Sequence, residues 1–200
     1  MTCPKFTPVS VTPWSARFAG RVAATLALAF AGLAQATTAP LVPGQWAEFN
    51  VDDVAAQSGG TEWIDYADGS ALSFTFTIAG PVELRVVDAG FAGDTFNVSV
   101  NGSSQLTSAV PAGVYSANQP ATVDFDAAWA DPSFSRLSWL LSAPGTYTVT
   151  GWLGQSVSNA GAPLNATIGA VMLAAVPEPG TWALLLAGLA VIGFTARRRA

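Results

Sequence analysis

The chain has 200 residues, which is enough for one domain with short appendages. Only 10% of its residues are charged, against about 25% in an ordinary globular domain. It contains no histidine, one cysteine (Cys3) and one lysine (Lys5). These absences exclude a Ser-His-Asp or Cys-His nucleophile, a zinc site of the usual Cys/His type and a lysine Schiff base in the body of the protein. The formal net charge of −5 argues against a nucleic-acid partner, because neutralising phosphates requires clustered Lys and Arg.

The N-terminus has the three parts of a secretory signal peptide. Basic residues precede an apolar run at residues 22–33, and an A-x-A cleavage pattern ends at Ala36. We therefore predict that residues 1–36 are a signal peptide, which signal peptidase removes between Ala36 and Thr37. The alternative is that the apolar run forms a buried helix of the mature domain. Cys3 would leave with the signal peptide, so the mature chain would rely on packing rather than on disulfides.

Residues 37–176 form the predicted exported domain, and their hydrophobic pattern has a period of two. Apolar and hydroxyl residues alternate across 72–78, as in a half-buried strand. Asn101-Gly102 indicates a tight hairpin, and segments rich in Gly, Pro, Asn and Asp, such as 88–90, indicate turns. No stretch outside the two ends has convincing helical periodicity. We predict an all-β fold, an antiparallel β-sandwich of the jelly-roll or Ig-like kind, with strands near 46–51, 72–78, 82–86, 96–100, 123–125, 136–141, 146–150 and 166–173.

The predicted domain is strongly acidic, because two arginines face twelve Asp and Glu residues and leave a formal net charge of −10. Asp88 and Asp94 flank a glycine-rich loop. A second group, near another loop, consists of Asp124, Asp126 and Asp131. Oxygen ligands on loops are what calcium prefers, and uncompensated acids repel one another unless cations screen them, so these aspartates are candidate calcium ligands. The alternative is turn capping, since Asp is favoured in turns through hydrogen bonds to nearby backbone.

Trp152 is the candidate for a carbohydrate contact. It falls on the same side of its strand as Thr148 and Thr150, which is the predicted outer face, and exposed aromatic rings stack on sugars. The alternative is that Trp152 fills space between the sheets. That role is predicted for Trp139, which falls on the inner face.

No catalytic site is predicted. The domain contains only three glutamates, and nothing in their spacing pairs them as the carboxylates of a glycosidase. A surface hydrolase is therefore the least favoured class of function, and we expect no cofactor other than calcium. The three glutamates are Glu48, Glu62 and Glu83.

The C-terminus carries a proline-rich triplet, an apolar stretch and a basic tail. Residues 181–196 are sixteen uncharged and mostly apolar residues. As a helix they would extend for about 24 Å, which barely spans a bilayer core of about 30 Å. The basic tail should stay in the cytoplasm, which places the preceding domain outside. A single-pass anchor that is never cut is the alternative. The triplet is Pro177, Glu178 and Pro179, and the tail begins with Arg197, Arg198 and Arg199.

This arrangement resembles the PEP-CTERM sorting signal of Gram-negative bacteria that make extracellular polysaccharide. The resemblance covers residues 177–200, with the motif at 177–180, the transmembrane helix at 181–196 and the basic tail at 197–199. It implies recognition by an exosortase, an integral membrane transpeptidase-like enzyme that cuts near the Pro-Glu-Pro triplet. The protein would then stay in the inner membrane transiently before it reaches the cell surface or the extracellular matrix.

The body of the chain also resembles a recurring type among PEP-CTERM proteins. The similarity runs from the strand at 72–78 through the segments 84–88, 93–98, 131–135 and 144–147. It implies a small exported β-sandwich and supplies no catalytic residues. The leading hypothesis is an exported, non-enzymatic protein with a structural or adhesive role in biofilm or exopolysaccharide. The alternatives are a calcium- or carbohydrate-binding module and, less favoured, the surface hydrolase.

Overall fold

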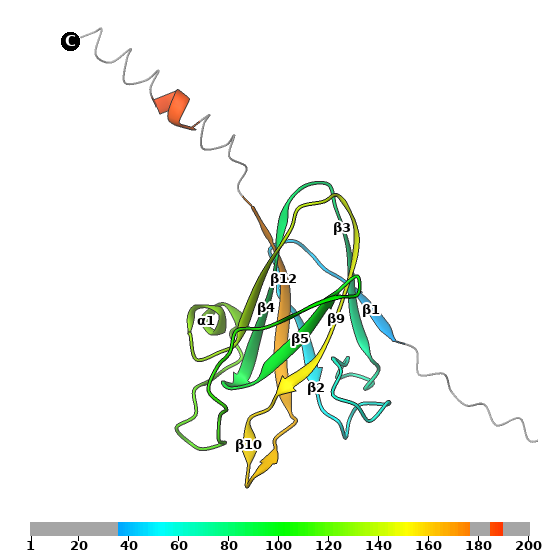
Figure 1. The fold of residues 1–200 in the computed structure, drawn as a ribbon, viewed down its shortest axis with the longest axis vertical. Coiled ribbons are helices and arrows are strands. Elements are labelled where there is room, and N and C mark those ends of the chain that lie inside the picture. The colour runs from blue at the N-terminus through cyan, green and yellow to red at the C-terminus, as the bar shows by residue number, and fades with distance from the viewer. Residues whose placement is uncertain (1–35, 177–184, 190–200) are drawn as a thin grey trace, which may run out of the picture. The chain divides into compact units, whose positions relative to one another are not determined.

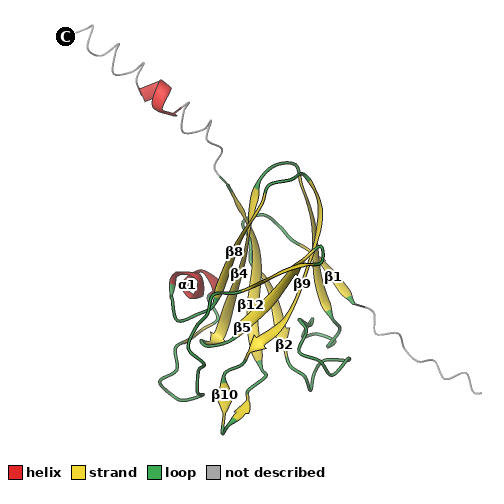
Figure 2. Cartoon of the chain, viewed as in Figure 1, coloured by secondary structure: helices red, strands yellow, loops and turns green. Residues whose placement is uncertain are grey.

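The computed structural model describes residues 36–176 and 185–189 (Figures 1 and 2). The body of the predicted signal peptide, the Pro177-Glu178-Pro179 triplet and the basic tail beginning at Arg197 lie outside the described residues. Residues 185–189 are helical and cover only the middle of the span predicted at 181–196. Within the described ranges, no helix is long and apolar enough to cross a membrane.

Residues 36–176 fold into two β-sheets that enclose one hydrophobic core, and the all-β prediction is confirmed. β1 pairs with β3 in parallel, whereas the neighbours within both large sheets are otherwise antiparallel. In spatial order the first sheet consists of β1 (Thr37–Pro40), β3 (Leu72–Ile78), β9 (Gly145–Gln155), β5 (Thr95–Val100) and β6 (Ser103–Leu106). The second consists of β2 (Ala47–Val51), β12 (Thr167–Ala175) and β4 (Val82–Phe91), with β8 (Arg136–Leu141) and β7 (Ala121–Thr122) both paired to β4. A small hairpin joins β10 (Ser158–Asn159) to β11 (Ala162–Pro163).

Aromatic rings pack against one another in the core between the sheets. The ring of Phe49 on β2 stacks on that of Trp63, with the centroids 3.9 Å apart and the planes 15° from parallel. Glycines on the neighbouring strands make room for this stack. A Cβ on Gly151 of β9 would lie 2.3 Å from Cε2 of Trp63, and one on Gly169 of β12 would lie 2.3 Å from Cζ of Phe49. The stack therefore requires a glycine on each of the two sheets.

The local signals for the β3 strand and the β5–β6 hairpin are confirmed. β3 spans the predicted residues, and its apolar side chains are buried while its hydroxyl residues are partly or fully exposed. Asn101 and Gly102 have φ angles of 47° and 85° between the paired strands β5 and β6. Both lie in the left-handed region that a tight hairpin of this kind requires. The Asn101 side chain also accepts a 2.8 Å hydrogen bond from the N–H of Thr148 on β9.

A short helix contradicts the strand predicted at 123–125 and the expectation of no helix within the domain. Helix α1 spans Phe125–Ala130 and lies beside β4 and β8 in Figure 2. The Asp124 carboxylate caps it, accepting hydrogen bonds from main-chain N–H groups of the first turn at 3.0 and 3.1 Å. Six residues make fewer than two turns, so the helical period is not visible in the sequence. The helix buries Ala128 in a second cluster with Val87 of β4.

β4 continues through the turn predicted at 88–90, which is also a correction. It pairs with β12 at Ala89 and with β7 at Gly90 before it ends at Phe91. Both faces of this part of β4 are covered, one by the main core and the other by the α1 cluster. Small residues fit in that confined space, so Ala89 and Gly90 extend the strand instead of ending it. Asp88 consequently lies within a strand and not on a loop.

Candidate functional site

Asp88 and Asp94 are brought together inside the sandwich. Asp88 lies on β4, and Asp94 follows a tight turn and immediately precedes β5. The Asp88 side chain shares a strand face with Leu84 and Val86, which belong to the core between the sheets. Asp88 is 0% exposed and Asp94 is 3% exposed. Two carboxyl groups are thus removed from water at one end of the core.

Main-chain and hydroxyl donors hold most of the oxygens of this pair. The N–H groups of Gly93 and Asp94 donate to Oδ2 of Asp88 at 3.2 and 3.3 Å. The N–H of Val157 donates to Oδ1 of Asp94 at 2.5 Å, and the hydroxyl of Thr167 donates to Oδ2 of Asp94. Oδ1 of Asp88 is the exception, because it is buried and has no hydrogen-bond partner.

The surroundings disfavour negative charge on both groups. Burial raises the pKa of Asp88 to about 9, the charge of Asp94 adds to that shift, and nearby main-chain N–H groups oppose it only in part. Burial also raises the pKa of Asp94, against the lowering effect of its hydrogen bonds from Thr167 and Val157. No basic side chain in residues 36–176 neutralises this pair of carboxylates. The two arginines of this segment bind elsewhere, Arg85 to Glu83 at 2.7 Å and Arg136 to the carbonyl of Trp129 at 2.6 Å.

The other three candidate aspartates lie at α1, and their carboxylates accept hydrogen bonds there. Asp124 caps the helix N-terminus, as described above. Oδ1 of Asp126 accepts a 2.9 Å hydrogen bond from the indole N–H of Trp46. Oδ1 of Asp131 accepts a 2.8 Å hydrogen bond from the N–H of Ser133. Among residues 36–176 and 185–189, no three His, Cys, Asp or Glu side chains come close enough to hold a metal ion. Any cation site in this part of the chain would therefore depend on hydroxyl and carbonyl oxygens as well as carboxylates.

Trp152 lies on the outer face of β9, as predicted. Its side chain is 41% exposed, and the exposed residues Thr148 and Thr150 precede it on the same face. Threonine hydroxyls extend this polar surface onto β3, where Thr77 contacts Thr146 at 2.9 Å. Trp139, by contrast, is partly buried and packs against the main core. The surface around Trp152 offers one aromatic face beside a row of hydroxyl groups.

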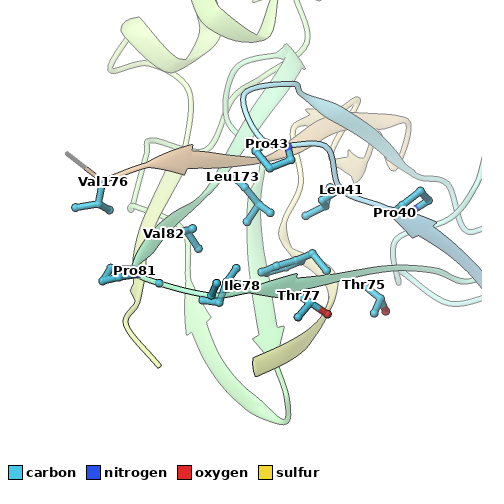
Figure 3. Close-up of a pocket in the computed structure, with 13 residues that line it drawn as sticks. Pro40, Leu41, Pro43, Thr75, Thr77, Ile78, Pro81, Val82, Leu173 and Val176 are labelled. Carbon is cyan, nitrogen blue, oxygen red and sulfur yellow. The ribbon is translucent and has the colours of Figure 1, made fainter. Parts of the chain in front are cut away.

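An apolar pocket at the opposite end of β4 and β12 was not predicted from the sequence. It has a volume of about 660 Å³, and none of its lining residues is charged (Figure 3). Nothing local in the sequence indicated that the prolines at 40, 43 and 81 meet around one space. Val176, the residue before the Pro-Glu-Pro triplet, also lines it. Its apolar lining includes Leu41, Phe76, Ile78, Val82 and Leu173.

Comparison with known proteins identifies the C-terminal segment. Residues 175–199 match the PEP-CTERM protein-sorting motif, which confirms the predicted resemblance. The motif implies an exported, exosortase-sorted protein with a membrane-anchored stage at its C-terminus. No curated protein sequence matches the chain. A solved structure, the pre-peptidase C-terminal domain of a collagenase from Bacillus anthracis, aligns over 70% of this chain and 94% of its own at 8% identity and a TM-score of 0.35. A likeness at that level identifies neither a family nor a function.

Proposed function

We propose that this chain is a non-enzymatic β-sandwich that exosortase releases at the cell surface or into the exopolysaccharide matrix, where it has a structural or adhesive role in biofilm. The observation that carries the proposal is the match of residues 175–199 to the PEP-CTERM sorting motif. The predicted signal peptide supplies export, and the short helix with its arginines supplies a temporary hold in the inner membrane. Exosortase and signal peptidase are the two processing partners.

The positions of the two proposed cuts support this route. β1 begins at Thr37, and the N–H of Thr37 donates a 2.8 Å hydrogen bond to the carbonyl of Ala71. Removal of residues 1–36 would therefore leave the first strand intact. At the other end β12 stops at Ala175, so a cut beyond Val176 removes no described strand. Both cuts leave the two sheets complete.

The experiment that tests the route replaces the triplet Pro177-Glu178-Pro179 with three alanines in the native host. An anchor needs only apolar length and the flanking arginines, whereas a processing enzyme must bind side chains and the extended backbone that prolines enforce. We expect the variant to accumulate uncut in the inner membrane, heavier than the wild type by the tail. An exosortase-deficient strain should give the same product from the wild-type gene. The proposal would be contradicted if the wild-type protein were recovered from the membrane with Ala200 still attached and the alanine variant had the same mass and location.

A second candidate function is carbohydrate binding at Trp152. The specific observation is the exposed indole beside Thr148 and Thr150, since aromatic faces stack on sugar rings and hydroxyl groups can hydrogen-bond to them. Titration with the host's soluble polysaccharide should show binding that Trp152→Ala removes. Tyr66→Ala is the matched control, because Tyr66 is an aromatic residue that is 66% exposed elsewhere. Equal binding by both variants would mean that Trp152 does not contact the sugar, and only the structural role would remain proposed.

A further inference from the structure

Five buried polar residues of the domain form one group around Asp88 and Asp94. The N–H of Asp88 donates a 2.9 Å hydrogen bond to the carbonyl of Ser135, so the two residues lie opposite each other and their side chains share a face. The hydroxyl of Ser135 contacts that of Thr107 at 3.0 Å. Thr167 reaches Asp94 from β12. All five residues are at least 95% buried.

We propose that Asp88 and Asp94, together with hydroxyl and main-chain oxygens around them, bind one calcium ion at this end of the sandwich. The observation that points to a ligand is Oδ1 of Asp88, a carboxylate oxygen of a fully buried residue that has no partner. Buried polar atoms in proteins are nearly always satisfied, so an orphaned one indicates a missing ligand or proton. The proposal does not depend on the sorting route.

The chemistry of the surrounding groups selects the ion. Every side chain of the cluster offers oxygen, and there is no histidine in the chain and no cysteine in residues 36–176. Such a set suits hard cations and not zinc or copper. Calcium accepts six to eight oxygens in irregular geometry, whereas magnesium demands a regular octahedron and gives up its water reluctantly. A buried site made of two carboxylates, hydroxyls and carbonyls from separate strands therefore fits calcium better.

The hydrogen bonds of the pair prepare the carboxylates for a cation. Gly93 and Asp94 donate to Oδ2 of Asp88, and Oδ1 receives no hydrogen bond. Val157 and Thr167 each occupy one direction on the two oxygens of Asp94, and a carboxylate oxygen can accept from more than one direction. A cation would offset the repulsion between two charges that neither of the two described arginines, Arg85 and Arg136, neutralises. The alternative that needs no ion is a proton held by the pair.

The test is calorimetric titration and thermal unfolding of the full chain in mild detergent, after chelation and then with millimolar calcium chloride. We expect about one ion per chain and an increase in Tm of roughly 5–10 °C, because a ligand of the native state stabilises it by mass action. Magnesium at the same concentration should give a smaller increase. Identical melting curves with chelator and with calcium would overturn the proposal and leave the shared proton as the explanation.

Variants locate the ion. Asp88→Asn keeps the oxygen that accepts from Gly93 and Asp94 and removes one charge, so the fold should persist while the calcium response disappears. Near-ultraviolet circular dichroism of the packed aromatic residues, the buried Trp63 among them, shows whether the variant is folded. If it is not, the wild-type titration alone tests the proposal. Asp65→Asn is the matched control, because its carboxylate also accepts a main-chain N–H, from Ala67 at 2.9 Å. A response that survives Asp88→Asn but is lost in Asp124→Asn would place the ion at α1 and overturn the assignment.

Discussion

The two ends of β4 and β12 differ in a way that reverses the usual distribution of polarity. The strands lie side by side along their whole length (Figure 1), with Val82 opposite Ala175 at one end and Ala89 opposite Ile168 at the other. At the first end, apolar side chains line an open pocket with no charged residue. At the second end, roughly 20 Å along β4, Asp88 is fully buried. Exposed apolar space and buried charge are the two informative departures from a normal surface and core. Each end is therefore a candidate site for binding something outside the domain.

The aromatic stack lies nearer the polar end than the apolar end. Gly169 of β12 pairs with Asp88 on β4 and with Phe49 on β2, so Phe49 and Asp88 lie on the same level of the second sheet. Phe49 stacks on Trp63, and Gly169 gives the ring of Phe49 room. The buried carboxylates therefore lie at the level of the two largest fully buried side chains of the core, whereas the pocket at the other end is open.

The largest expected effect is that of Trp63→Ala, which removes one ring of the aromatic stack. Trp63 is 0% exposed, and truncation of a buried tryptophan costs roughly 3–5 kcal/mol in the free energy of unfolding. Chemical denaturation should show this loss, and the calcium response should weaken because the stack lies on the level of Asp88. Trp152→Ala, at an exposed tryptophan, is the control and should change stability by less than about 0.5 kcal/mol. Unchanged stability of Trp63→Ala would mean that the aromatic stack does not stabilise the polar end of the core.

Leu173→Ala tests whether the apolar end acts alone. Leu173 is 2% exposed beside the pocket, and a buried Leu→Ala change costs about 2–5 kcal/mol. We expect a lower Tm with an unchanged calcium-induced increase, which is the reverse of the outcome for Asp88→Asn. Thermal melts of both variants with chelator and with calcium measure the two effects. Loss of the calcium response in Leu173→Ala would mean that the ends are coupled through β12.

Gly80→Ala is the smallest change and probes the open space at the pocket rim. A Cβ at Gly80 would meet no atom within 4 Å, and its φ is not in the left-handed region. We expect a gain of about 0.4–1 kcal/mol, because alanine restricts the unfolded chain. Gly169→Ala, whose Cβ would collide with Phe49, should instead destabilise. Denaturant midpoints with unchanged slopes give both values, and destabilisation by Gly80→Ala would indicate that the rim is more crowded than the structure shows.

The sequence by itself determined the features that depend on local pattern. Alternation at residues 72–78 predicted β3, Asn101-Gly102 predicted a hairpin with two positive φ angles, and the C-terminal triplet, apolar stretch and arginines predicted the sorting motif. These signals lie within a few residues of one another, so no tertiary contact is needed to detect them. The signal peptide, the calcium ligands and the carbohydrate contact remain predictions.

Only the tertiary structure decided what lies on both faces of β4. Asp88-Ala89-Gly90 has the composition of a turn, but cover from the core and from α1 makes it a strand and buries Asp88. The partners that surround the pair come from far along the chain, Ser135 and Thr107 being 28 residues apart and Thr167 and Asp94 being 73 apart. The apolar pocket likewise combines β3, β4 and β12. Periodicity reports the faces of one segment, whereas burial and pairing depend on which distant segments pack against it, and no local pattern carries that information.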